Sequence, residues 1–149
     1  MSIDPSCFLN SPLGNAITQT QLNDALLSHG HWQARYRYLM TLGLQLPELA
    51  PEWRTDDALV AGCESASWLH HLEYQGHHFW LADSEARIVR GLLVLVLAAY
   101  NGKTQAQIAE MDLTPWFQQL GLSGHLSPSR SNGLYAVIRQ IQQTAALSG

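Results

Sequence analysis

The sequence predicts an α+β fold: a single domain in which a small antiparallel β-sheet packs against several α-helices. Three observations support this fold class. Apolar residues make up 46% of the 149 residues and charged residues only 13%, as in a folded domain with a sizeable core. One short stretch has the alternation of a β-hairpin, and most of the remaining chain carries helix start and stop signals.

Residues 1–17 are expected to form a flexible N-terminal tail. Pro5, Pro12 and Gly14, together with several serine and asparagine residues, interrupt any regular hydrophobic pattern there. The folded domain is therefore expected to occupy residues 18–149.

Two helices are expected at the beginning of this domain. Thr18 and Gln21 have the spacing of a capping box, so the first helix begins near Thr18 and ends before Gly30. Apolar residues recur at helical spacing over residues 32–45, and Pro47 follows as a stop signal.

A β-hairpin is expected next, followed by a buried helix. Residues 68–74 and 77–82 have strand-like patterns, and Gln75 and Gly76 form a two-residue turn between them. Asp83 and Ser84 are expected to end the second strand and to cap a helix from about residue 85 to residue 100. The second half of this helix is apolar on all sides, which indicates a central position in the core.

The C-terminal third predicts three further helices. Thr104 and Gln107 form a second capping box for a short helix. Another short helix is expected at residues 116–120. Ser127 and Pro128 supply a cap and a first-turn proline for a last helix that runs to about Ala146.

The charge and hydropathy of the chain exclude several classes of partner. The net charge is −4 and Lys103 is the only lysine, so nucleic acid and anionic membranes are poor electrostatic matches. The longest uncharged apolar run, residues 91–100, is shorter than the roughly 20 residues that cross a bilayer. The N-terminus lacks the pattern of a secretory signal. We therefore expect a cytoplasmic protein with reduced thiols and no membrane or nucleic-acid partner.

Cys63 is the first candidate for chemistry. The chain has two cysteines, Cys7 and Cys63, which are too few for a disulfide scaffold or a four-thiolate metal site. Gly62 precedes Cys63 and permits backbone angles that let a thiol project from a tight loop. A buried cysteine that packs as a small apolar residue is the alternative, and composition alone favours it.

Histidines gather in the expected hairpin and suggest two other kinds of site. The predicted register places His71, Glu73 and His78 on one face, a set of ligands suited to zinc. A solvated polar face is favoured instead, and no metal site is expected. Cys63, a histidine and Asp83 supply the residue types of a hydrolase triad, but the sequence carries no oxyanion-hole motif.

Arg130 lies in the first turn of the last expected helix. The helix dipole disfavours a cation there, so the arginine either has a tertiary role or is simply exposed.

The segment around Cys63 resembles the SufE/CsdE family of sulfur-acceptor proteins. The family pattern around the working cysteine is G-C-x-S-x-V-W. Gly62, Cys63, Ser65 and Trp68 fit this pattern, and Ser67 stands where valine is usual.

Further segments resemble the same family in the same order. Residues 83–92 match the pattern D-S-D/E-x-x-I-V-x-G-L throughout, and residues 126–134 match L-S/T-x-S-R-S-x-G-L. Residues 115–117 and 36–43 are also similar. Each motif alone is weak, but together they cover nearly the whole expected domain and imply a SufE-like fold.

The resemblance implies that Cys63 accepts persulfide sulfur from a cysteine desulfurase of the SufS/CsdA type. The protein would stimulate that enzyme and pass sulfur to an iron–sulfur scaffold or to another acceptor. It would not be an enzyme by itself and would hold no cofactor, because pyridoxal phosphate belongs to the desulfurase. The alternative is a binding module that activates the desulfurase allosterically and carries no sulfur on Cys63.

The residues around Cys63 suggest further roles, given that a carrier must shield its sulfur between partners and expose it to them. Val60 and Trp68 are expected to cover the thiol, and the loop is expected to swing about Gly62. Arg130 is expected to anchor one loop state, by bonding a loop carbonyl or Asp83. The residues assigned a supporting role are Arg130, Asp83, Gly62 and Ser65, and those assigned to partner contact are Glu64, Ala66, Ser67 and Trp68.

Overall fold

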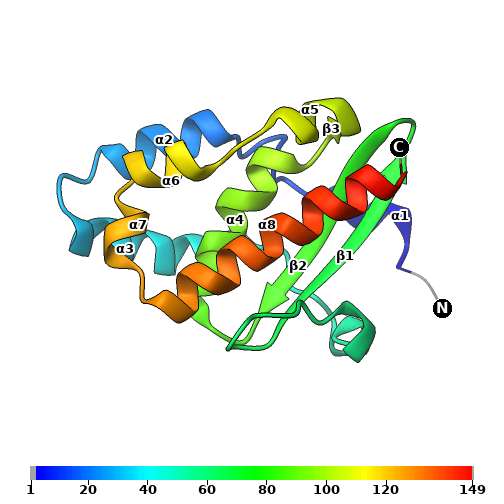
Figure 1. The fold of residues 1–149 in the computed structure, drawn as a ribbon, viewed down its shortest axis with the longest axis horizontal. Coiled ribbons are helices and arrows are strands. Elements are labelled where there is room, and N and C mark those ends of the chain that lie inside the picture. Colours follow the sequence, from blue (N-terminus) through cyan, green and yellow to red (C-terminus); the bar gives the residue numbers. More distant parts are fainter. Residues whose placement is uncertain (1–2, 149) are drawn as a thin grey trace.

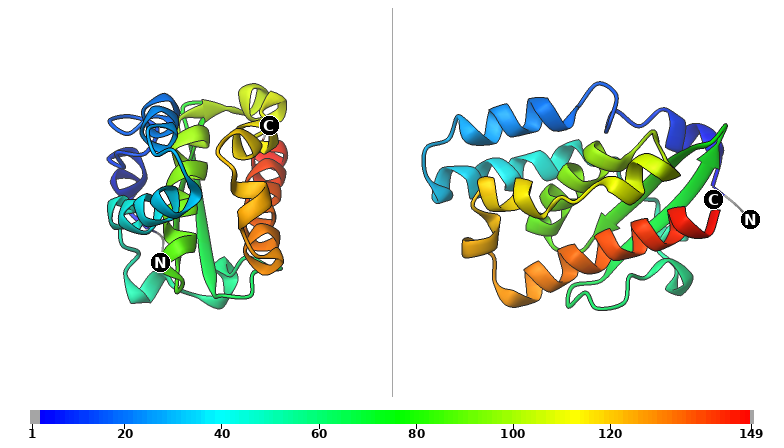
Figure 2. Two further views of the ribbon diagram at one scale, coloured as in Figure 1. Left: turned by 90° about the vertical axis from the view of Figure 1, so that its left-hand side faces the viewer. Right: turned by 45° about the horizontal axis from the view of Figure 1, so that its top comes forward.

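The computed structural model describes residues 3–148 and has the α+β architecture expected from the sequence. Helix α4 (Arg87–Tyr100) lies at the centre and contacts α2, α3, α8 and strand β2 (Figure 1). In the left view of Figure 2, α4 and the β-hairpin lie between the α2–α3 pair on one side and α8 on the other. This central position explains why residues 91–100 are buried without exception.

The N-terminal segment is folded, contrary to the expected flexible tail. Helix α1 (Pro5–Leu9) begins at Asp4, whose side chain accepts a hydrogen bond from the backbone N–H of Ser6. Phe8 and Leu13 are only 4% and 2% exposed. The side-chain amide of Asn101 donates to the backbone carbonyl of Leu13. The tail prediction is therefore wrong for residues 3–17, because long-range packing fixes a segment that its own sequence pattern leaves irregular.

Helices α2 (Gln19–Leu27) and α3 (Trp32–Leu42) confirm the first two helices of the domain. Both bonds of the Thr18 and Gln21 capping box are present at the start of α2. Helix α3 continues into a 3-10 turn, η1 (Gly43–Gln45), which accounts for the longer helix expected from the sequence. A side chain at Gly91 would overlap the backbone carbonyl of Leu39, so this glycine lets α3 and α4 pack in direct contact.

The sheet confirms the expected hairpin and its register. Strands β1 (Ser67–Tyr74) and β2 (His77–Ser84) are antiparallel, and Tyr74 pairs with His77 across the turn. Gln75 and Gly76 both have positive φ angles, as a two-residue hairpin turn requires. A two-residue strand, β3 (Lys103–Thr104), adds to the other edge of β2 and was not expected from the sequence.

The two faces of the hairpin bury separate apolar clusters. Leu69 and Trp80 belong to the main core around α4. Trp68 and Leu81 belong to a second cluster with Phe8 of α1 on the opposite side. Two short 3-10 turns, η2 (Pro51–Trp53) and η3 (Asp56–Ala58), connect η1 to the hairpin. The alternation of β1 therefore places Trp68 away from the main core.

Asp83 does not cap α4, contrary to the sequence prediction. It is the next-to-last residue of β2, is fully buried and forms ion pairs with Arg54 and Arg90. The N-cap residue of α4 is Ala86, and the Ser84 hydroxyl accepts the backbone N–H of Ala86. The Asp83 carboxylate thus forms tertiary contacts, and the Ser84 hydroxyl accepts a backbone N–H at the start of the helix.

The remaining helices follow the sequence closely, with one addition. The capping box of Thr104 and Gln107 is formed at α5 (Gln105–Glu110), and α6 is Thr114–Gln119. Helix α7 (Leu122–His125) was not expected. Helix α8 (Pro128–Ser148) is the longest and runs back past α4 towards the hairpin turn (Figure 1). Over the described residues, no helix is both long and apolar enough to span a membrane.

Candidate functional site

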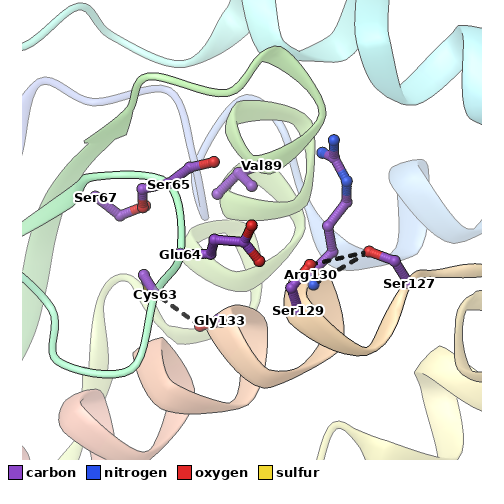
Figure 3. Close-up of a pocket in the computed structure, with 9 residues that line it drawn as sticks. All are labelled: Cys63, Glu64, Ser65, Ser67, Val89, Ser127, Ser129, Arg130 and Gly133. Carbon is purple, nitrogen blue, oxygen red and sulfur yellow. Dashed lines mark hydrogen bonds between the residues drawn. The ribbon is translucent and has the colours of Figure 1, made fainter.

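Cys63 lies in the loop that enters β1, directly against α8. Gly62 has a φ of 93°, in the left-handed region that favours glycine, and this turns the loop so that Cys63 faces the helix. The Cys63 Sγ donates to the backbone carbonyl of Gly133 over 3.6 Å (Figure 3). A Cβ at Gly133 would lie 3.5 Å from the sulfur, an ordinary packing distance, so the thiol lies close against the backbone of α8. The thiol is consequently half-buried between loop and helix.

A small cavity of about 120 Å³ opens beside this sulfur. The loop, α4 and the start of α8 form its walls, and most of its lining side chains are polar. The lining residues are Cys63, Glu64, Ser65, Ser67, Val89, Ser127, Ser129, Arg130 and Gly133 (Figure 3). The structure therefore brings three segments together: the cysteine loop, the first turn of α4 and the first turns of α8. Of the residues predicted to support Cys63, Ser65 and Arg130 line this cavity.

Burial controls the reactivity of the thiol in this state. Desolvation is the largest effect and raises the pKa of Cys63 above its ordinary value, while the nearby Ser67 hydroxyl lowers that pKa in part. The thiolate is the nucleophilic form of cysteine, so a raised pKa protects the sulfur at neutral pH.

Alkylation should reveal this protection. At neutral pH, iodoacetamide is expected to modify Cys63 more slowly in the folded protein than in protein unfolded by urea. In the folded protein the alkylation rate should still rise with pH above 9.0, because burial raises the pKa of Cys63 above this ordinary value. Mass spectrometry of the Cys63 peptide across a pH series gives this rate. A plateau below pH 9 in the folded protein would contradict a raised pKa.

Arg130 lies on the cavity wall and does not reach Asp83. Its backbone N–H donates to the Ser127 hydroxyl, which caps the start of α8. Over the described part of the chain, its guanidinium makes no ion pair or side-chain hydrogen bond. Asp83 is already paired with Arg54 and Arg90. Arg130 therefore does not bond Asp83 in this state, and Asp83 is not among the residues that line the cavity.

The residues expected to contact a partner differ in accessibility. Glu64 is exposed and Ala66 is half-buried. Ser67 and Trp68 are only 1% and 8% exposed. Trp68 packs in the second apolar cluster beneath the guanidinium of Arg54, so the expectation that Trp68 covers the thiol is wrong. Sequence analysis missed Val89, Ser127, Ser129 and Gly133, although the segments that resemble the SufE/CsdE patterns contain all four.

The hairpin histidines make structural contacts. His71 Nε2 lies 2.7 Å from His78 Nδ1, and His78 Nε2 lies 3.4 Å from a carboxylate oxygen of Glu73. Burial, followed by the neighbouring His78, lowers the pKa of His71. The described residues contain no group of three potential ligands arranged to hold a metal ion. Since neither a histidine nor Asp83 lines the Cys63 cavity, the geometry does not support the hydrolase triad.

Fold and site together define an α+β domain with one half-buried cysteine in a small polar cavity between a loop and a helix. The chain belongs to the family described as "SufE: Fe-S metabolism associated domain", whose family model matches residues 20–145. This confirms the resemblance seen in the sequence motifs and places the protein in iron–sulfur metabolism.

A solved structure supports the fold. The chain is similar to the solution structure of a hypothetical protein from Thermus thermophilus, with a TM-score of 0.69. The two are 18% identical in sequence, and the match covers 88% of this chain and 96% of the other.

Proposed function

We propose that this protein accepts sulfur on Cys63 from the persulfide of a cysteine desulfurase and passes it on. The observation that carries the proposal is the position of Cys63, half-buried in a polar cavity of a chain that belongs to the SufE family. A thiol in such a cavity has space for one additional sulfur atom and is shielded from solution oxidants.

The proposed step is a thiol exchange. The Cys63 thiolate attacks the outer sulfur of the desulfurase persulfide, a new S–S bond forms on Cys63, and the desulfurase cysteine leaves as a thiolate. No external oxidant is needed, because one S–S bond replaces another. The same exchange then delivers sulfur to an iron–sulfur scaffold or to another acceptor. Pyridoxal phosphate supplies the carbon–sulfur cleavage in the desulfurase, and this chain requires no cofactor for its own step.

The loop is proposed to move when the partner binds. The Cys63 sulfur contacts Gly133 of α8 and is half-buried, so the helix covers part of it in this state. Ala61, Gly62 and Glu64 around it are exposed, and Gly62 has the backbone freedom of a hinge. Loop opening would both expose the sulfur and relieve the desolvation that raises its pKa.

Incubation with a desulfurase tests the proposal. With a desulfurase of the SufS/CsdA type, pyridoxal phosphate and cysteine, the wild-type protein should gain the mass of sulfur, and dithiothreitol should remove it. Peptide mapping should locate the added sulfur on Cys63. Stimulation of the desulfurase without any mass gain would reject the carrier function and favour the allosteric alternative.

A further inference from the structure

Strand β1 is an edge strand whose outer side is only partly covered. The sheet order is β1-β2-β3, so one side of β1 has no neighbouring strand. At its start, the N–H of Val60 donates to the carbonyl of Ser67 on this outer side. Alternate residues of an antiparallel strand direct their backbone groups to the same side, so the N–H and C=O groups of His71 and Glu73 also face outward. Within the described residues 3–148, these backbone groups have no hydrogen-bond partner.

A groove of about 510 Å³ borders this uncovered part of the edge. His70, His71 and Leu72 of β1 form one wall, and residues of α1 and η2, among them the apolar Phe8 and Trp53, form the others. The His70 Nε2 donates to the Trp53 carbonyl over 2.7 Å, and the two rings meet edge to face, so these walls are held together. The volume lies within the roughly 300–1,000 Å³ of ligand-binding sites, and the groove is formed without any ligand.

The carboxylates at the groove favour a basic partner. Asp57 lines the groove, Glu73 lies on the free edge, and both are exposed. Arg54, the one cation in the segment between η1 and the hairpin, is paired with the buried Asp83. A second copy of this chain, related by a two-fold axis, would bring the same acidic surface against itself. Charge complementarity therefore favours a basic segment of another protein over self-association.

We propose that the outer edge of β1 binds an extended segment of a partner protein, in which apolar residues alternate with basic ones. The segment would add a strand to the sheet through the backbone groups of His71 and Glu73. Side chains of a strand point alternately to its two faces, so one set would enter the apolar groove beside Leu72. The other set would be basic and would meet the carboxylates of Asp57 and Glu73. The groove and the Cys63 cavity share no lining residue, so this site is separate from the one proposed for sulfur transfer.

A short synthetic peptide tests the inference. The probe is acetyl-Lys-Leu-Lys-Leu-Lys-amide, titrated into isotope-labelled wild-type protein while NMR follows the backbone N–H signals. The signals of His71 and Glu73 should shift as peptide is added. Their exchange with solvent should slow by on the order of tenfold at saturating peptide, because an added strand supplies hydrogen-bond partners.

Matched controls separate backbone pairing from charge. A probe with a methyl group on the backbone nitrogen of its central lysine keeps every side chain but cannot pair there, so it should bind on the order of tenfold more weakly. The charge-reversed peptide acetyl-Glu-Leu-Glu-Leu-Glu-amide should not bind. Asp57→Asn should weaken binding of the lysine probe by about two- to fivefold. Asp24→Asn, which removes an equal charge from an exposed position on α2, should leave binding unchanged.

Several outcomes would overturn the inference. Unchanged signals of His71 and Glu73 would show that no strand is added to this edge, and equal binding of the methylated probe would show that backbone pairing is not involved. Equal binding of the glutamate peptide would reject a basic partner. Protection of the same N–H groups without peptide, increasing with protein concentration, would place a second copy of the chain on the edge instead. None of these measurements depends on sulfur uptake, so this inference and the proposed function fail separately.

Discussion

Protein with serine in place of Cys63 is expected to take up no sulfur from a desulfurase. A serine hydroxyl cannot form the S–S bond that holds the transferred sulfur, and it ionises far less readily than a thiol. The substitution changes one atom of a half-buried side chain that makes a single weak bond to Gly133, so the fold should be retained. Loading should therefore fall from one sulfur per chain to none while the melting temperature changes little.

Cys7→Ser is the matched control and should load as wild type does. Cys7 is exposed on α1, whereas Cys63 lies in the cavity beside α8. An exposed thiol has no wall that would align or shield a persulfide. Intact mass with and without dithiothreitol measures loading in both variants, and sulfide release measures desulfurase turnover. Full loading of Cys63→Ser would contradict the carrier function.

Turnover in the same samples separates the carrier from the allosteric alternative. If Cys63 carries sulfur, desulfurase turnover with Cys63→Ser should fall to the level of the desulfurase alone. If the protein acts only by binding, Cys63→Ser should stimulate turnover as the wild type does.

Local signals in the sequence predicted most of the elements, because those elements depend on neighbouring residues. The capping boxes at Thr18 and Thr104 form as expected. The hairpin register follows from the turn at Gln75 and Gly76. Each of these features is fixed by hydrogen bonds or backbone angles within a few residues, which a sequence pattern can represent.

Features set by distant contacts were not predictable in the same way. Phe8 and Leu13 are buried by segments far along the chain, so Pro12 and other breakers near them mark turns and not disorder. Alternation along β1 indicates that Trp68 and Leu69 face opposite sides, but it cannot say which side holds Cys63. Composition alone favoured a structural role for Cys63, and only the family motifs identified it as the candidate site.

Asp83 belongs to a segment that matches the family pattern, but the capping role that its neighbours suggested is wrong. The aspartate follows a strand and precedes a helix, which is the pattern of a cap. The arginines that bind it lie 29 residues before it and 7 residues after it, so their role was visible only in the folded chain. Their position predicts that Asp83 contributes to stability.

Asp83→Ala is expected to cause a large loss of stability. The buried carboxylate accepts from Arg54, Arg90 and the backbone N–H of Leu49. Arg90 also donates to the carbonyls of Gly43 and Leu46, so the carboxylate and this arginine together tie the segment before the hairpin to β2 and α4. Its removal leaves two partly buried guanidiniums without a counter-charge.

Breaking a buried ion pair by removing one partner typically costs about 3–5 kcal/mol. For a domain of this size, that corresponds to a fall in melting temperature of roughly 6–20 °C.

Asp83→Asn keeps the shape of the side chain and one oxygen acceptor but loses the charge, so its melting temperature should lie between those of wild type and Asp83→Ala. Asp57→Ala is the control, because Asp57 is an exposed aspartate in the same connecting segment. Calorimetry on the four proteins gives their melting temperatures. An Asp83→Ala protein with the melting temperature of wild type would show that the ion pairs of Asp83 do not stabilise the fold.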